Sequence, residues 1–307
     1  MVFESPDLII CWLFVKAQDM RTLLAVSQDI LVVTFDQIRL NPLEPPPGIK
    51  PIQWGSIFAD LWIQAFMLYE GSKGFLLECL NNLYGKYSSL GYWPGLFDLH
   101  HYVKNLKFPA ISRTARYQES VLNRLGDLIY GSLSSVFDCS TGHSTFLTKQ
   151  HTIFEILYLT AEQQVFMVNY LISYLFNYKL INETGIRHFI GIDDANLVFD
   201  RSFENRPDLG LPTIHHLLTT VRKTKINIFA CTQTPAQLGA SINSNTFAKI
   251  MFSLSHGNDI AFMQHSMGIK DPEQQAYCYQ LQPREIVLKF STRYQRPFVA
   301  QVPEVAI

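Results

Sequence analysis

The second half of the chain alternates short apolar runs with segments of helical periodicity, and this alternation constrains the fold more than any other feature. The runs are apolar at consecutive positions, which is typical of strands buried on both faces. Strands separated by helices favour a parallel sheet with helices packed on it, so the sequence predicts an α/β fold. The predicted strands are residues 152–159, 187–192, 226–231, 248–254 and 285–290, and the predicted helices are residues 161–179 and 212–222.

The first half adds two apolar runs and a long helical region. Residues 8–15 and 30–35 are predicted strands, whereas residues 54–87 and 96–135 have apolar positions at helical spacing. Residues 41–48 contain four prolines, which fit neither a helix interior nor a central strand, so we expect a loop over the surface. Because the sequence has no internal repeat, we expect residues 1–307 to form a single core.

Composition narrows the function classes. Hydrophobic residues make up 48% of the chain and charged residues 17%, which suits extensive buried surface. The net charge of −1 argues against a protein that coats DNA by bulk attraction, but it leaves room for a ring that grips DNA with a few loops. No apolar run approaches the roughly 18 residues that span a bilayer, and the N-terminus lacks the basic start of a signal peptide. We therefore expect a cytoplasmic protein without direct membrane insertion.

Two carboxylates, Asp193 and Asp194, directly follow the apolar run 187–192. In open α/β sheets ligands bind at the carboxyl ends of the strands, so both acids are expected at a binding edge. Asp193 can hold Mg²⁺ there, directly or through water, and Asp194 can orient or deprotonate an attacking water. This is the layout of a Walker B strand. Paired acids at a strand end also cap helices, and that structural role stays open.

The predicted strand 226–231 ends in a polar segment that begins with Thr232 and Gln233. On a neighbouring strand these residues would lie beside the two acids, where Thr232 can contact a nucleotide and Gln233 can sense its γ-phosphate or position water. An ordinary polar turn before Pro235 is the alternative. Arg222 ends the preceding helix, where a cation is favourable in any case. It is also a candidate arginine finger that reaches the nucleotide of a neighbouring subunit.

In this order the segments resemble the HerA/FtsK superfamily of P-loop ATPases, above all the HerA-like ATPases and the ATPases of conjugation and type IV secretion. The matching segments are residues 15–21, 41–43, 193–195, 217–223, 232–238, 242–245 and 249–252. The resemblance covers most of the chain, and residues 96–135 look like a helical insertion. It implies a RecA-like core, ATP and Mg²⁺ as cofactors, a hexameric ring as homo-oligomer, DNA as a partner, and contact with a membrane-associated secretion or conjugation machinery.

Two features depart from the family pattern. Family members usually carry Glu where Asp194 stands, and the side chain shorter by one methylene can draw a general base away from its water. The phosphate-binding Walker A motif, G-x-x-x-x-G-K-[ST], occurs nowhere in the 307 residues, and residues 71–74 and 140–145 are its nearest approximations. The strand that precedes this motif is predicted to be missing too, because residues 8–15 already match the second strand. We expect such a sheet to expose an edge or to change its strand order, and the chain to be part of a longer protein.

Three hypotheses of function follow. The first is the ATPase core of a translocase that couples ATP hydrolysis to movement of DNA, or of a protein–DNA substrate, with this chain alone inactive for lack of the Walker A loop. The second is a catalytically inactive scaffold or assembly subunit with a motor-like fold. An unrelated metabolic α/β enzyme is a third hypothesis, which no dinucleotide loop, nucleophile elbow or metal cluster in the sequence supports.

Overall fold

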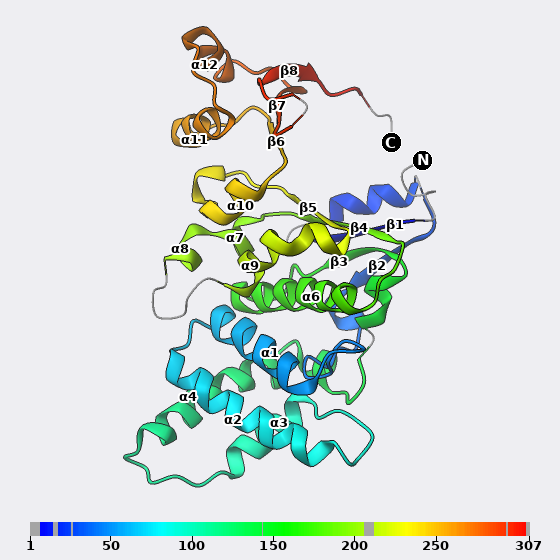
Figure 1. Ribbon diagram of the computed structural model, residues 1–307, viewed down its shortest axis with the longest axis vertical. Helices are drawn as coiled ribbons and strands as arrows, with labels where there is room; N and C mark the ends of the chain where they lie inside the picture. Colours follow the sequence, from blue (N-terminus) through cyan, green and yellow to red (C-terminus); the bar gives the residue numbers. More distant parts are fainter. Residues whose placement is uncertain are drawn as a thin grey trace.

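A five-stranded parallel sheet forms the middle of the molecule, between a helical layer and a small C-terminal unit (Figure 1). The computed structural model describes residues 7–14, 18–25, 27–142, 144–205, 212–292 and 294–304, without the side chains of residues 13, 14, 18–20, 145, 216 and 222. The strand order is β2-β3-β1-β4-β5. The strands are β1 (Leu8–Phe14), β2 (Ile30–Thr34), β3 (His151–Glu155), β4 (Arg187–Ile192) and β5 (Ile226–Ala230).

The predicted parallel sheet is confirmed, with one strand shorter than expected. β4 lies between β1 and β5, so that Ile190 is opposite Cys11 on one side and Ile228 on the other. β3 ends at Glu155 instead of residue 159 because the chain turns there. The N–H of Leu159 donates to the carbonyl of Ile156 at 3.2 Å, and the turn leaves its neighbouring residues outside the ladder.

One face of the sheet is covered by helices throughout. The helices of the chain are α1 (Pro51–Ala65), α2 (Glu70–Tyr87), α3 (Leu96–Asn105), α4 (Arg113–Ile129), α5 (Ser134–Phe137), α6 (Ala161–Ile181), α7 (Asn196–Phe199), α8 (Arg201–Glu204), α9 (Thr213–Thr220), α10 (Ala240–Asn245), α11 (Gly257–Met267) and α12 (Pro272–Cys278). α6 is apolar around most of its circumference because it lies between the sheet and the helical layer (Figure 1). Thr160 caps its N-terminus by accepting from Gln163 N–H.

The helical layer contains α1 to α5, a larger unit than the predicted insertion at residues 96–135. α3 and α4 fall within that range, as expected, and both pack against α2. α1 contacts α2 on one side and α6 on the other, so it connects the layer to the rest of the core. Trp54, Phe58 and Trp62 of α1 are completely buried at this junction.

The prediction that residues 41–48 lie over the surface was wrong. Asn41 and Leu43 are fully buried between the helical layer and the sheet. Buried loop backbone needs hydrogen-bond partners, and side chains supply them here. Trp54 Nε1 donates to the carbonyl of Pro42 at 2.9 Å, and the Tyr84 hydroxyl donates to that of Leu43 at 2.7 Å. Asn41 Nδ2 in turn donates to the carbonyl of Ser140 at 2.8 Å, so the loop ties distant segments together.

The opposite face of the sheet is covered only over β2 and β3 in the described part of the chain, by the 3₁₀ helix η2 (Gln18–Ala25). Over β4 and β5 it carries an aromatic cluster of Trp12, Phe189 and Phe229, whose ring centroids are 5.9–6.0 Å apart. Phe229 is 37% exposed. β5 has no strand beyond it among the described residues, so its outer edge is open there.

The last three strands form a separate antiparallel sheet, which corrects the prediction that residues 248–254 and 285–290 join the parallel one. Its order is β6-β7-β8, with β6 (Ala248–Met251), β7 (Glu285–Phe290) and β8 (Phe298–Gln301). The sequence predicted no strand at β8. Met251 and Val287 pack with α11 and α12 into a small core of their own. Apolar runs thus identified β6 and β7, but not the sheet to which they belong.

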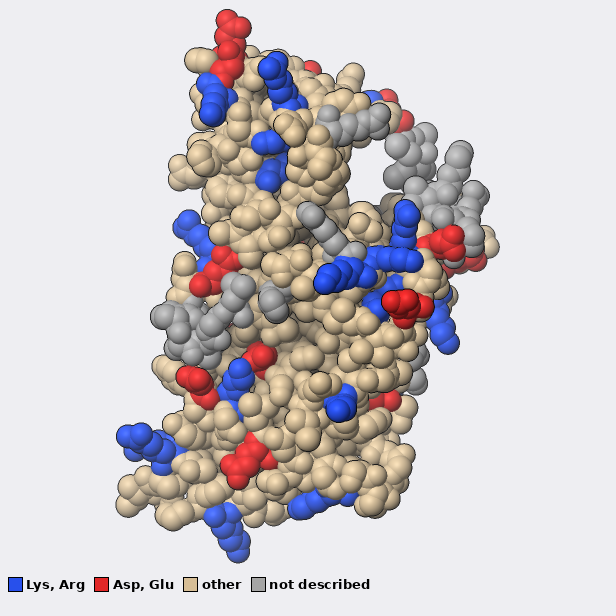
Figure 2. Space-filling model, in the orientation of Figure 1, with Lys and Arg blue, Asp and Glu red and all other residues tan. Residues whose placement is uncertain are grey.

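Charged side chains are scattered over the face shown in Figure 2, without a concentrated basic surface. This distribution agrees with the near-zero net charge. No helix within the described ranges combines the length and the apolar character needed to cross a bilayer.

His188 gives the fold a pH dependence. Its side chain is 1% exposed on the helix-covered face of β4, and burial together with the nearby Lys179 charge lowers its pKa from 6.5 to about 4. The folded state therefore disfavours protonation of His188. The stability that its neutral side chain contributes is fully present above pH 6.5 and is lost as pH drops towards 4. We expect a loss on the order of 3 kcal/mol across this window, measured by urea unfolding at a series of pH values. In His188→Leu this loss should shrink, and an unaltered slope in that variant would contradict the assignment.

Gly191 leaves room for the Trp12 ring, which occupies the space where a Cβ atom would stand. We expect Gly191→Ala to destabilise the fold by about 1–3 kcal/mol because the ring must move within a packed face. Gly74, in the middle of α2, is the matched control, since a Cβ there meets nothing within 4 Å. Gly74→Ala should stabilise by about 0.5–1 kcal/mol. Denaturant midpoints of both variants test this, and equal shifts of the same sign would show that Trp12 does not lie against Gly191.

Candidate site at the carboxyl ends of β4 and β5

The ladder between β4 and β5 continues past the ends of both strands. Cys231 N–H donates to the carbonyl of Ile192 at 2.9 Å, and Ala195 N–H donates back to the carbonyl of Cys231 at 2.7 Å. These two bonds fix the segment 193–195 against the segment after β5. Asp193 and Asp194 therefore lie beside Cys231 and Thr232, as the sequence predicted for neighbouring strands.

Asp194 has a left-handed backbone conformation, with φ of 51°. Such a conformation costs a non-glycine residue roughly 1–2 kcal/mol, and strain of this kind persists where the surroundings hold it in place. Here the following residue, Ala195, is completely buried and hydrogen-bonded to Cys231. The sharp turn ends β4 and allows α7 to begin two residues later. Both acids remain half-buried at the sheet edge.

The charge of Asp193 influences its neighbour across the ladder. Burial and the Asp193 carboxylate raise the pKa of the Cys231 thiol to about 11. This thiol therefore stays protonated at neutral pH and is a poor nucleophile. Cys231 is therefore not a candidate nucleophile at this edge.

A polar network built around Asn196 links the two segments. Asn196 Nδ2 donates to the Thr234 hydroxyl at 2.6 Å and to Gln237 Oε1 at 3.1 Å, while the Thr232 hydroxyl donates to Asn196 Oδ1. Sequence reasoning missed Asn196. The sequence signal for it was an amide side chain, which both donates and accepts hydrogen bonds, directly after residues 193–195. The next predicted strand is followed by a Thr-x-Thr segment that such an amide could bind.

Gln233 and Arg222 have different relations to this edge. Gln233 is exposed between Thr232 and Thr234, two residues beyond Cys231, which is hydrogen-bonded to the segment that contains the acids. The backbone of Arg222 lies in η5 (Val221–Thr224), which precedes β5 and so stands at its amino end. A five-residue strand at about 3.3 Å per residue separates the two ends by roughly 17 Å. Gln233 therefore follows β5 at the same end of the sheet as the acid pair, whereas the backbone of Arg222 lies at the other end within one protomer.

Neither approximation of a phosphate-binding loop has the structure of one. Residues 71–74 lie within α2, and Lys73 forms an ion pair with Asp60. In residues 140–145, the N–H of Gly142 donates to Glu44 Oε2 at 2.6 Å, so a carboxylate already occupies that donor. The Ser144 hydroxyl is buried against Tyr170. His143 lies outside the described residues.

The acid pair fits a magnesium ion. Mg²⁺ prefers oxygen ligands, keeps several waters, and is commonly held by one or two carboxylates together with substrate phosphates. Asp193 and Asp194 supply such a pair at the end of β4. Within the described residues there is no group of three or more His, Cys, Asp or Glu side chains suited to a metal. A site completed by water and phosphate therefore matches this chain better than a protein-only cage.

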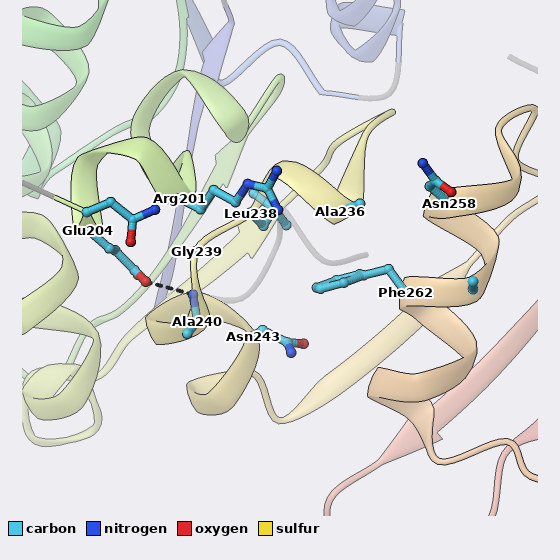
Figure 3. Close-up of a pocket in the computed structure, with 11 residues that line it drawn as sticks. Arg201, Glu204, Ala236, Leu238, Gly239, Ala240, Asn243, Asn258 and Phe262 are labelled. Atoms are coloured by element: carbon cyan, nitrogen blue, oxygen red, sulfur yellow. Dashed lines mark hydrogen bonds between the residues drawn. The ribbon is translucent and has the colours of Figure 1, made fainter.

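A cavity of about 610 Å³ opens between α8, α10 and α11 (Figure 3). Arg201, Asn243 and Phe262 line it, and none of the predicted site residues does. On one side Glu204 accepts hydrogen bonds from the N–H groups of Ala240 and Ser241 at 2.8 and 3.0 Å. The carboxylate of Glu204 thus secures the start of α10.

Ser241, His215 and Glu204 come together beside this cavity without forming a catalytic triad. The Ser241 hydroxyl and Glu204 Oε1 approach the same imidazole nitrogen, Nδ1, at 2.7 and 2.8 Å. The other nitrogen, Nε2, lies 3.2 Å from the carbonyl of Val198. A triad needs the serine and the acid on opposite nitrogens. The cluster is therefore structural and gives no support to a hydrolase.

Comparison with solved structures identifies the fold. The chain is similar to VirB4 of Thermoanaerobacter pseudethanolicus, with a TM-score of 0.74, 11% identity, and 98% of this chain and 83% of that chain covered. It is also similar to the plasmid coupling protein TrwB in complex with ADP and Mg²⁺, with a TM-score of 0.63, 12% identity, and coverage of 98% and 86%. No protein-family model matches the chain, and no curated protein matches its sequence. The chain thus has the RecA-like fold of VirB4 and TrwB, as the resemblance to HerA/FtsK-type ATPases implied.

Proposed function

We propose that the chain is the Walker B half of an ATPase motor core of the HerA/FtsK type. The proposal rests on two segments at the carboxyl ends of adjacent parallel strands, one with Asp193 and Asp194 and the other with Thr232 and Gln233, which the continued ladder joins through Cys231. Ligands bind at this edge in open α/β sheets. The likeness to VirB4 and to TrwB, which was solved with ADP and Mg²⁺, supports a nucleotide as the ligand.

Each residue has a distinct role in this proposal. Asp193 holds Mg²⁺, which neutralises charge on the nucleotide phosphates when bound. Asp194 orients the attacking water and accepts its proton as the water oxygen bonds to the γ-phosphorus and ADP leaves. Thr232 contacts the nucleotide, and Gln233 senses the γ-phosphate. The Asp194 side chain is shorter than the Glu that is usual in motors of this type. The left-handed backbone conformation of Asp194 also changes the direction in which its side chain leaves the backbone.

The phosphate-binding loop would come from polypeptide that adds to the sheet at β5. The outer edge of β5 is open in the described part of the chain, and the adjoining aromatic cluster of Trp12, Phe189 and Phe229 offers an apolar surface for a helix. A strand followed by the loop and its helix would pair with the edge and cover the cluster. The segment would then deliver backbone N–H groups to the phosphates beside Asp193.

Arg222 would act in a neighbouring protomer. Its place at the amino end of β5 separates it from the acid pair of its own chain, so an arginine finger there needs a second copy. This requirement supports a ring, for which we propose a homo-hexamer that moves DNA or a protein–DNA substrate. The ring would work in the cytoplasm, against a membrane-associated secretion or conjugation partner.

A non-catalytic scaffold is the second candidate. The observation in its favour is that neither approximation of the phosphate loop forms a cradle, since one lies within α2 and the other donates to Glu44. Such a subunit would keep the motor fold for assembly and bind no nucleotide.

Binding of Mg²⁺-ATP to the purified chain separates the two candidates. We expect weak, saturable binding without turnover, because the acid pair is present and the loop is not. Saturation-transfer NMR suits weak binding, and Asp193→Ala should abolish the signal. Asp29→Ala is the matched control, since Asp29 is an exposed acid before the amino end of β2, at the opposite edge of the sheet.

Wild-type protein that gives no Mg²⁺-dependent signal at any nucleotide concentration would contradict the claim that the acid pair binds Mg²⁺-nucleotide without the loop, and would favour the scaffold. Equal loss in Asp193→Ala and Asp29→Ala would show that the signal reports net charge instead of a site.

A further inference from the structure

The segments that follow β4 and β5 are hydrogen-bonded at both ends of a seam, defined as residues 195–200 against residues 231–239, and Asn196 bonds across it between these ends. At one end Ala195 N–H donates to the carbonyl of Cys231, and at the other Gly239 N–H donates to the carbonyl of Phe199 at 2.8 Å. Backbone groups make the bonds at both ends. The central bonds come from one side chain, that of Asn196.

The hydrogen bonds through Asn196 run in a single direction. The Thr232 hydroxyl donates to Asn196 Oδ1, Asn196 Nδ2 donates to the Thr234 hydroxyl, and that hydroxyl can donate onward to Gln237 Oε1 at 3.2 Å. A second hydrogen on Nδ2 reaches the carbonyl of Thr234 or Gln237 Oε1, each at 3.1 Å. This series of hydrogen bonds requires an acceptor and a donor on the same side chain. The amide of Asn196 supplies both, whereas a carboxylate or a methyl group does not.

The two threonines that Asn196 binds are the direct neighbours of Gln233. Thr232 and Thr234 are themselves joined, because Thr234 N–H donates to the Thr232 hydroxyl at 3.1 Å. Gln233 is thus an exposed residue between two anchored ones. Its backbone position depends on the contacts of its neighbours.

The Asn196 side chain serves the opposite segment and not its own helix. Asn196 is the first residue of α7, and the N-cap position, Ala195, makes no side-chain cap. A capping asparagine would accept a hydrogen bond from the N–H groups of its own first turn. The carboxamide of Asn196 instead bonds across the seam to residues after β5.

We infer that Asn196 is a positioning residue that holds Gln233 beside the Asp193–Asp194 pair, an inference that rests on the proposed function of this edge. Asn196 directly follows residues 193–195, the turn that contains both acids, so a shift of the acids moves the amide as well. The amide then moves both neighbours of Gln233. Loss of the Asn196 bonds leaves the acid pair intact but no longer fixes the position of Gln233. A misplacement of about 1 Å can cost a catalytic group much of its effect.

The test uses Mn²⁺ as a paramagnetic substitute for Mg²⁺ in protein labelled with ¹⁵N at glutamine. In the wild type, Mn²⁺ at the acid pair should broaden the side-chain signal of Gln233, which Gln233→Glu identifies by its disappearance. In Asn196→Ala and Asn196→Asp this broadening should fall several-fold, while the Mn²⁺ affinity of Asn196→Ala stays as in the wild type.

Thr234 supplies a matched pair of variants. Thr234→Val keeps the shape and removes the hydroxyl that accepts from Asn196, so it should reduce the broadening as Asn196→Ala does. Thr234→Ser keeps the hydroxyl and should restore it. A purely structural role for the seam predicts changes in thermal midpoint without this dependence on the hydroxyl.

The outcomes separate the two claims. Broadening that is strong in the wild type and equally strong in Asn196→Ala and Thr234→Val overturns the positioning role alone. A wild-type Gln233 signal that Mn²⁺ does not broaden, or broadening that persists in Asp193→Ala, overturns the metal site and the positioning role with it.

Discussion

The candidate site depends on the parallel ladder between β4 and β5, which does not stop where the strands stop. Two backbone hydrogen bonds extend it through Cys231, and they place an acid turn from one strand against a polar segment from the next. Because the ladder spacing is fixed at about 4.8 Å, the distance between these segments is set by the sheet and not by the side chains. The left-handed conformation of Asp194 is tolerated for the same reason, since Ala195 is buried and bonded on the far side of the turn.

The rest of the fold stabilises this arrangement from one side. α6 packs between the sheet and the helical layer, and the proline-containing loop, residues 41–48, fills the junction between them. Buried Trp54 and Tyr84 satisfy the loop carbonyls that would otherwise be unpaired. On the other side the sheet remains incomplete at β5 within the described residues, with Phe229 partly exposed. A rigid covered face next to an open edge is the geometry that an added strand and helix would complete.

Much of this fold could be predicted from the sequence, because buried parallel strands and a fully buried helix have direct compositional signals. The strands at residues 187–192 and 226–231 and the helix at residues 161–179 agree with β4, β5 and α6 to within two residues. The partition of strands into two sheets could not be predicted, since an apolar run does not record its pairing partner. The burial of the loop at Asn41 was also missed, because proline content reports what a segment cannot form and not where it lies. Asn196 escaped notice because its role depends on contacts across 36 to 41 residues of sequence.

Anomalous diffraction from crystals grown with Mn²⁺ and a non-hydrolysable ATP analogue would test the central claim, that the ends of β4 and β5 form a divalent-cation site. We expect an anomalous peak within coordination distance of the Asp193 carboxylate, with the phosphates of the analogue on the far side of the metal. A peak at another position, or crystals that contain ordered analogue without a metal at Asp193, would contradict it.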